Sequence, residues 1–139
     1  MEEGRLAKLE GHMEEGRLAN KVAVVTGGGN GIGRSTAMRF AQEGAAVVVA
    51  DIQKEKAEET VSMIIDSGGL AQSIRVDVTS GSDNEDMAQL AVENFGGLDC
   101  LVTAAGISHA NYVSGDIEPD IKNIVSSRLE YLERPGWDF

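Results

Sequence analysis

Short apolar runs alternate with amphipathic stretches between residues 21 and 102. The runs are rich in Val, Ala, Ile and Leu without polar alternation, which is typical of strands buried on both faces of a sheet. They cover 22–25, 46–50, 71–76 and 99–102. The stretches with apolar residues at helical spacing run from 32 to a stop at Gly44, from 54 to 67 and from 82 to 95. This alternation predicts an α/β protein with a doubly wound parallel sheet.

The third helix has a start signal, because Ser82 is followed three residues later by Glu85, the spacing of a capping box. Further along the chain the pattern loosens. Apolar residues within 117–129 share one helical face, and Pro135 marks a stop. This segment is expected to be one amphipathic helix that packs against a neighbour.

The first twenty residues stand apart from this pattern. The heptapeptide MEEGRLA occurs at 1–7 and again at 13–19. An offset of twelve residues is too short for a structural repeat, whose period is usually about 20 to 50 residues. We interpret 1–20 as a disordered upstream extension, with a functional tail as the alternative. The sheet-forming half-domain is expected at 21–107, and a loop with the amphipathic helix at 108–139.

Composition narrows the range of partners. The 139 residues include 12 basic and 23 acidic ones, and the net charge of −11 disfavours nucleic acid and anionic membranes. No apolar stretch approaches the roughly 18 residues of a membrane span, and the glutamate-rich start lacks the apolar core of a signal peptide. The single cysteine, Cys100, lies in an apolar run, which favours a buried structural thiol in a reducing compartment. These features predict a cytoplasmic protein.

A glycine cluster, TGGGNGIG at 26–33, lies between the first strand and the first helix. A dinucleotide needs its pyrophosphate bound at this position, against the unpaired amides of the helix start. Gly27 can make the sharp turn out of the strand, Gly31 leaves room for the pyrophosphate, and Gly33 lets the helix pack close to the sheet. The other contacts expected from this loop are Gly29, Asn30 and Ile32.

An acidic residue, Asp51, ends the second strand twenty residues after Gly31. That offset suits a carboxylate that binds the two hydroxyls of an adenosine ribose. The same carboxylate would repel a 2′-phosphate, and neither Ile52 after it nor Asn30 before Gly31 is basic. NAD is therefore favoured over NADP, and Ile52 is included among the cofactor contacts.

A phosphate-binding P-loop is the competing interpretation, because 28–35 reads G-x-x-x-x-G-R-S. That motif requires a lysine that reaches the β- and γ-phosphates, whereas this chain has Arg34. A P-loop would also leave Asp51 without a role. An NTPase is therefore disfavoured.

These residues together resemble the short-chain dehydrogenase/reductase family over about 18–107. TGGGNGIG is similar to the family's TGxxxGxG fingerprint, and Asp51 matches its ribose-binding acid. Asp77 and Val78, in RVDVT, match the position that contacts adenine in this family. FGGLDCLVTAAGI at 95–107 is similar to the segment that usually ends in NNAG near the nicotinamide ribose. The further cofactor contacts that the resemblance implies are Asp77, Val78, Ala104, Ala105 and Gly106.

Two departures bear on the activity that the resemblance implies. Thr103 and Ala104 stand where the family usually has two asparagines. Family members interconvert alcohols and ketones with a tyrosine acid/base, a lysine four residues later and an upstream serine. Tyr112 and Tyr131 are followed at that spacing by an aspartate and a proline, and a tyrosine near its free pKa of about 10 is a poor base. We assign no catalytic residue in this chain, and interpret His109 as a solvated loop residue.

Three functional hypotheses remain. The chain is the NAD-binding portion of an oxidoreductase and inactive alone, or a non-catalytic nucleotide-binding module, or a non-functional fragment. The resemblance implies further strands and a homo-oligomer in full-length relatives, so we expect a Rossmann-type sheet truncated after about the fourth strand. Its edge would expose Leu101 and Val102 and leave the chain marginally stable. No residue cluster has metal-ligand spacing, so no metal is expected.

Overall fold

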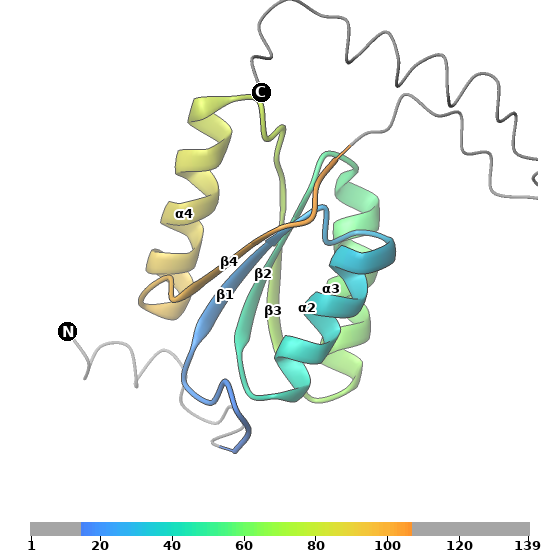
Figure 1. Ribbon diagram of the computed structural model, residues 1–139, viewed down its shortest axis with the longest axis vertical. Helices are drawn as coiled ribbons and strands as arrows, with labels where there is room; N and C mark the ends of the chain where they lie inside the picture. The colour runs from blue at the N-terminus through green and yellow to red at the C-terminus, as the bar shows by residue number, and fades with distance from the viewer. Residues whose placement is uncertain (1–14, 107–139) are drawn as a thin grey trace, which may run out of the picture. The chain divides into compact units, whose positions relative to one another are not determined.

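The computed structural model describes residues 15–106. Within them, strands and helices alternate along the chain as β1 (Val22–Thr26), α2 (Gly31–Gln42), β2 (Ala46–Asp51), α3 (Lys54–Asp66), β3 (Leu70–Arg75), α4 (Gly81–Phe95) and β4 (Cys100–Thr103). All strand pairs are parallel, and the order across the sheet is β3-β2-β1-β4 (Figure 1). The predicted parallel α/β architecture is confirmed.

Several predicted features fall on residues outside this range. They are the amphipathic helix within 117–129, most of the extension 1–20, Tyr112, Tyr131 and His109. Within 15–106, no helix is both long and apolar enough to cross a membrane.

Helices cover both faces of the sheet, with α2 and α3 on one face and α4 on the other (Figure 1). Alternate residues of β1 contribute to two apolar layers. Val22 and Val24 pack in the layer that includes Met87 of α4, while Ala23 and Val25 pack in the layer of α2 and α3. Because both faces of β1 are covered, every residue of this strand is buried and its sequence shows no polar alternation.

The strand β4 lies at one edge of the described sheet, next to β1. Leu101 is 55% exposed, as predicted for this edge. Val102 and Cys100 point to the opposite face, where they are half-buried against the layer of α2 and α3. The prediction of an exposed Val102 is therefore wrong, and the thiol of Cys100 is only partly buried.

The start of α4 is capped by Ser80 rather than by Ser82. The Ser80 hydroxyl accepts a hydrogen bond of 3.3 Å from the amide of Asp83. The hydroxyl of Ser82 lies 3.1 Å from that of Ser80. The predicted capping box from Ser82 to Glu85 is wrong because the helix begins at Gly81, which places its N-cap at Ser80, two residues before Ser82.

Residues 15–20, expected to be part of the extension, form a turn beside the end of α2. Leu18 donates its amide to the carbonyl oxygen of Glu43 at 2.8 Å. Arg17 donates its amide to the Glu43 carboxylate at 3.1 Å, and this bond lowers the pKa of Glu43. Hydrogen bonds thus join this turn to the α2–β2 connection.

Candidate functional site

The carboxyl ends of the four strands meet at one edge of the sheet, because every strand pair is parallel. The chain reverses its direction of strand addition beside β1, which lies between β2 and β4. In open α/β sheets, ligands bind at such a reversal, outside the carboxyl ends of the strands. The loops that follow β1, β2, β3 and β4 therefore form the candidate site.

The loop after β1 turns so tightly that glycine is required at two positions. Gly27 has a φ of +65°, and a Cβ atom there would lie 2.7 Å from the backbone of Ala105. At Gly33, in the first turn of α2, a Cβ atom would overlap the carbonyl oxygen of Gly27. The turn at Gly27 and the close helix packing at Gly33 agree with the sequence prediction.

Gly31 differs from these two glycines in its surroundings. Its φ is +53°, and a Cβ atom there would meet no atom within 4 Å. Asn30 caps the helix beside it, where Oδ1 accepts a hydrogen bond of 2.8 Å from the Gly31 amide. The following first-turn amides have no acceptor within the helix, and α2 has no acidic residue in its first turn. The open space at Gly31 thus faces the partial positive charge of a helix start, which suits an anion.

Asp51 ends β2 with its carboxylate held by two backbone amides. Gly29 donates to Oδ2 at 2.9 Å, and Gln53 donates to Oδ1 at 2.9 Å. A side chain at position 29 would collide with this arrangement, because a Cβ atom there would lie 2.8 Å from Oδ2 of Asp51 and 2.6 Å from Cβ of Lys56. The acid predicted from sequence spacing therefore lies directly against the glycine loop.

Two basic side chains on the adjoining helices pair with Glu59. Nη2 of Arg34 lies 3.0 Å from the Glu59 carboxylate, and Nζ of Lys56 lies 3.3 Å from it. The hydrogen bond from Arg34, followed by that from Lys56, lowers the pKa of Glu59. Arg34 also donates through Nε to the hydroxyl of Thr60 at 3.0 Å. Its guanidinium is thus bound to α3, which argues against the phosphate-reaching role that a P-loop needs at this position.

The loop after β3 is held by the start of α4. Asp77 donates its amide to Oδ2 of Asp83 at 2.9 Å, and the side-chain amide of Asn84 donates to the carbonyl oxygen of Val78 at 3.0 Å. Oδ1 of Asp77 accepts hydrogen bonds from the hydroxyl of Thr79 at 2.6 Å and from its amide at 3.0 Å. These two bonds lower the pKa of Asp77 below its ordinary value.

Exposed aliphatic side chains accompany three of the four loops. The exposed fractions are 82% for Ile32, 54% for Ile52 and 44% for Val78. Ile52 and Val78 follow β2 and β3, which are paired neighbours. These two loops therefore combine carboxylates with apolar surface, the mixture of groups found in small-molecule sites.

The loop after β4 is attached to β1 through Thr26. Ala104 donates its amide to the carbonyl oxygen of Thr26 at 3.2 Å, and Ala105 donates its amide to the Thr26 hydroxyl at 3.4 Å. Thr26 is buried, with 4% of its surface exposed. Backbone amides, rather than the side chains of the two alanines, therefore make this junction. Gly106 is the last described residue.

Some side chains that hold these loops were not predicted from the sequence; they include Thr60, Asp83 and Asn84. Thr60 is fully buried, and its hydroxyl donates to the carbonyl oxygen of Gly28 at 2.8 Å. It lies with Ala57 and Ile64 on the buried face of α3. A lone hydroxyl on an otherwise apolar helical face is the signal that identifies such a residue, because a buried polar group needs a partner.

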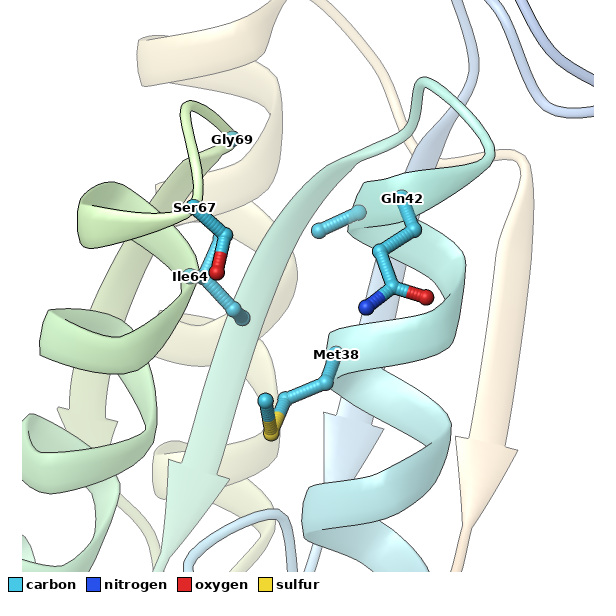
Figure 2. Close-up of a pocket in the computed structure, with 6 residues that line it drawn as sticks. Met38, Gln42, Ile64, Ser67 and Gly69 are labelled. Atoms are coloured by element: carbon cyan, nitrogen blue, oxygen red, sulfur yellow. The ribbon is translucent and has the colours of Figure 1, made fainter.

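A small cavity between α2 and α3 lies away from the strand carboxyl ends (Figure 2). It has a volume of about 20 Å³. Its lining residues, near the C-terminal ends of the two helices, are Met38, Ala41, Gln42, Ile64, Ser67 and Gly69. A space of this size holds about one water molecule, so it is a packing gap rather than a ligand site. Residues 15–106 contain no cluster of three or more side chains suited to a metal ion.

Comparison with known families matches residues 21–129 to the family described as short chain dehydrogenase. The 2,5-dichloro-2,5-cyclohexadiene-1,4-diol dehydrogenase of Sphingobium indicum is 48% identical over 93 residues, which are 67% of this chain and 37% of that protein. Among solved structures, a hydroxysteroid dehydrogenase from Escherichia coli has a TM-score of 0.66 and 35% identity, over 83% of this chain and 46% of that one. A short chain dehydrogenase/reductase from Burkholderia phymatum in complex with NAD has a TM-score of 0.58 and 34% identity, over 63% and 30%. The chain thus spans less than half the length of each of these proteins.

Proposed function

This chain belongs to the short-chain dehydrogenase family, and we propose that its described residues form the NAD-binding portion of an oxidoreductase that interconverts alcohols and ketones. The observation that carries the proposal is the contact between the glycine loop and Asp51. A single hydrogen bond of 2.9 Å from Gly29 joins the expected pyrophosphate cradle to the expected ribose acid. The relative solved in complex with NAD supports the same cofactor here.

The pyrophosphate would lie at the start of α2. Gly31 leaves the space open, and the first-turn amides that follow Asn30 supply donors to an anion. Exposed Ile32 lies in the same turn. When bound, NAD supplies the acceptor for a hydride, while these residues hold and orient it.

The adenosine would extend across the ends of β2 and β3. Asp51 would accept hydrogen bonds from the ribose hydroxyls, and Ile52 and Val78 would pack against the adenine. The Asp77 carboxylate would accept a hydrogen bond from the exocyclic amine of the adenine. The nicotinamide ribose would then lie toward Ala104, Ala105 and Gly106, beyond the end of β4.

NAD is proposed over NADP because of the charges around Asp51. A 2′-phosphate beside this carboxylate would place like charges together. Arg34 and Lys56, the cations on the adjoining helices, already pair with Glu59. Neither is therefore available to neutralise the additional phosphate without losing its present partner.

Turnover by these 139 residues alone is not expected. Neither Tyr112 nor Tyr131 has the lysine four residues later that lowers the pKa of the family's catalytic tyrosine. This observation favours a second candidate, a nucleotide-binding module that does no chemistry by itself. An assay of NAD reduction with a panel of secondary alcohols tests the inactivity that both candidates predict for these residues, since a rate above the blank would contradict it.

The partners proposed are those that membership of the family implies. They are the dinucleotide, a small alcohol or ketone in the complete enzyme and further copies of that enzyme. The net charge of −11 argues against nucleic acid and anionic membranes, and we propose a cytoplasmic location.

The binding proposal is tested by thermal unfolding of the chain with and without NAD. A ligand that binds only the folded state stabilises it by about 2.7 kcal/mol at a concentration of 100 times Kd. We expect the melting temperature to rise with NAD concentration. No rise at millimolar NAD would contradict the proposed function.

A further inference from the structure

Thr60, on α3, contacts the glycine loop at a single peptide unit. Its Oγ1 lies 2.8 Å from the carbonyl oxygen of Gly28 and 3.0 Å from Nε of Arg34. The Arg34 group can only donate, so it occupies a lone pair of the hydroxyl and leaves the hydroxyl proton for a carbonyl. The alternative acceptor, the carbonyl oxygen of Lys56, is farther away at 3.3 Å. Thr60 is 0% exposed, so water does not compete for this proton.

The same peptide unit is bound to Asp51 at its other end. The carbonyl of Gly28 and the amide of Gly29 belong to one planar group and point in opposite directions. That amide donates to Oδ2 of Asp51 at 2.9 Å. A rotation of this peptide would therefore break the bond to Thr60 and the bond to Asp51 together.

We propose that Thr60 is a positioning residue that fixes the Asp51 carboxylate, through the Gly28–Gly29 peptide, in the orientation that selects NAD over NADP. The inference rests on the proposed function. It deepens that function by assigning the selectivity to a fully buried hydroxyl on a neighbouring helix. Without the hydroxyl, the Gly28 carbonyl loses a buried partner and the peptide can turn. Asp51 then loses one of its two backbone amides.

A purely structural role for Thr60 predicts a different result. Loosening α3 from the loop would weaken NADH and NADPH binding alike, because both share the pyrophosphate and the adenine. A positioning role weakens NADH more than NADPH, because only the unmodified ribose benefits from a correctly aimed carboxylate. The ratio of the two dissociation constants therefore distinguishes the roles.

The test is a calorimetric titration of the full 139-residue chain with NADH and NADPH, for Thr60→Val, Thr60→Ser and Thr36→Val. Thr36 is the matched control, because its hydroxyl donates to the carbonyl oxygen of Ile32 within α2 at 2.8 Å. We expect Thr60→Val to reduce the preference for NADH by about threefold to tenfold, as the loss of a buried hydrogen bond implies. Thr60→Ser should keep the preference, and so should Thr36→Val.

A second measurement follows the mobility of the Gly28–Gly29 peptide in the absence of any ligand. Hydrogen exchange of the Gly29 amide should be faster in Thr60→Val than in the unaltered chain, and unchanged in Thr60→Ser. If Thr60→Val fails to fold, Thr60→Ala provides the same comparison, because it also removes the hydroxyl that donates to the Gly28 carbonyl. Its preference for NADH should fall as well.

The outcomes separate the inference from the proposed function. If the unaltered chain binds neither dinucleotide, the proposed function fails and the inference fails with it. If the unaltered chain prefers NADH and the folded variant, Thr60→Val or its substitute Thr60→Ala, keeps the full preference, the inference alone is overturned. Equal losses for NADH and NADPH overturn it as well.

Discussion

The backbone amide of Gly29 donates a hydrogen bond of 2.9 Å to Oδ2 of Asp51, so the loop after β1 and the end of β2 form one structural unit. The second oxygen of the carboxylate accepts from Gln53 at 2.9 Å. Both oxygens therefore have fixed directions before any ligand arrives. Preorganisation of this kind reduces the conformational entropy lost on binding.

Replacing Asp51 by asparagine should weaken NADH binding about tenfold to a hundredfold, since hydrogen bonds to a charged group contribute about 1.5 to 3 kcal/mol. NADPH binding should be unchanged or tighter, because the proposed repulsion between the carboxylate and a 2′-phosphate would be removed. The two affinities are measured by calorimetric titration. Asp66→Asn, at the exposed end of α3, is the control and should change neither. Unaltered NADH affinity in the Asp51 variant would remove the proposed role of this residue.

Gly31 and Gly68 form a matched pair for the pyrophosphate cradle. Both have positive φ, +53° and +86°, and at both a Cβ atom would meet nothing within 4 Å. Alanine at either position should cost about 1 to 2 kcal/mol of stability through backbone strain. Only Gly31→Ala should also weaken NADH binding, by about tenfold or more, because its methyl group would occupy space needed by the pyrophosphate. Equal binding by the two variants, measured by titration, would place the pyrophosphate elsewhere.

Gly33 tests the close packing of α2 on the glycine loop. A Cβ atom there would overlap the carbonyl oxygen of Gly27. Gly33→Ala should therefore lower the free energy of unfolding by at least about 1 to 3 kcal/mol. Gly81→Ala, in the first turn of α4, meets no atom within 4 Å and should be neutral or slightly stabilising. Urea denaturation followed by circular dichroism gives both values. A Gly33→Ala protein as stable as the unaltered chain would contradict the packing described.

Thr79 lowers the pKa of Asp77. Its hydroxyl makes the largest contribution to the lowered pKa of that carboxyl, whose ordinary value is 3.8. A lowered pKa stabilises the folded state above the ordinary value, and this stabilisation is lost as pH falls through the folded value. Thr79→Val should therefore raise the pKa of Asp77, and should lower stability at neutral pH by an amount that disappears under acidic conditions below pH 3.8. Carboxyl NMR titration measures the pKa, and Thr79→Ser should leave it lowered.

The sheet and its helices could be predicted because the spacing of apolar residues indicates which faces of the strands and helices are buried. The positions of Asp51 and of the loop glycines in the fold could also be predicted, since a strand–loop–helix unit fixes the spacing of its parts. The cap of α4 could not, because Ser80 and Ser82 are both suitable residues and only the helix start decides between them. Thr60 itself is marked by a lone hydroxyl on the apolar face of α3, but its partner could not be predicted, for a related reason. Its partner, the Gly28 carbonyl, is 32 residues away and is brought to it only by the packing of α3 against the loop.

The most direct test of the account is a calorimetric titration of the unaltered chain with NADH, with NADPH titrated under the same conditions. We predict saturable binding of NADH and weaker binding of NADPH, because in the proposed site Asp51 would accept from the free ribose hydroxyls and would repel a 2′-phosphate. Equal or tighter binding of NADPH would contradict the role given to Asp51. Failure of both dinucleotides to bind would contradict the dinucleotide site itself.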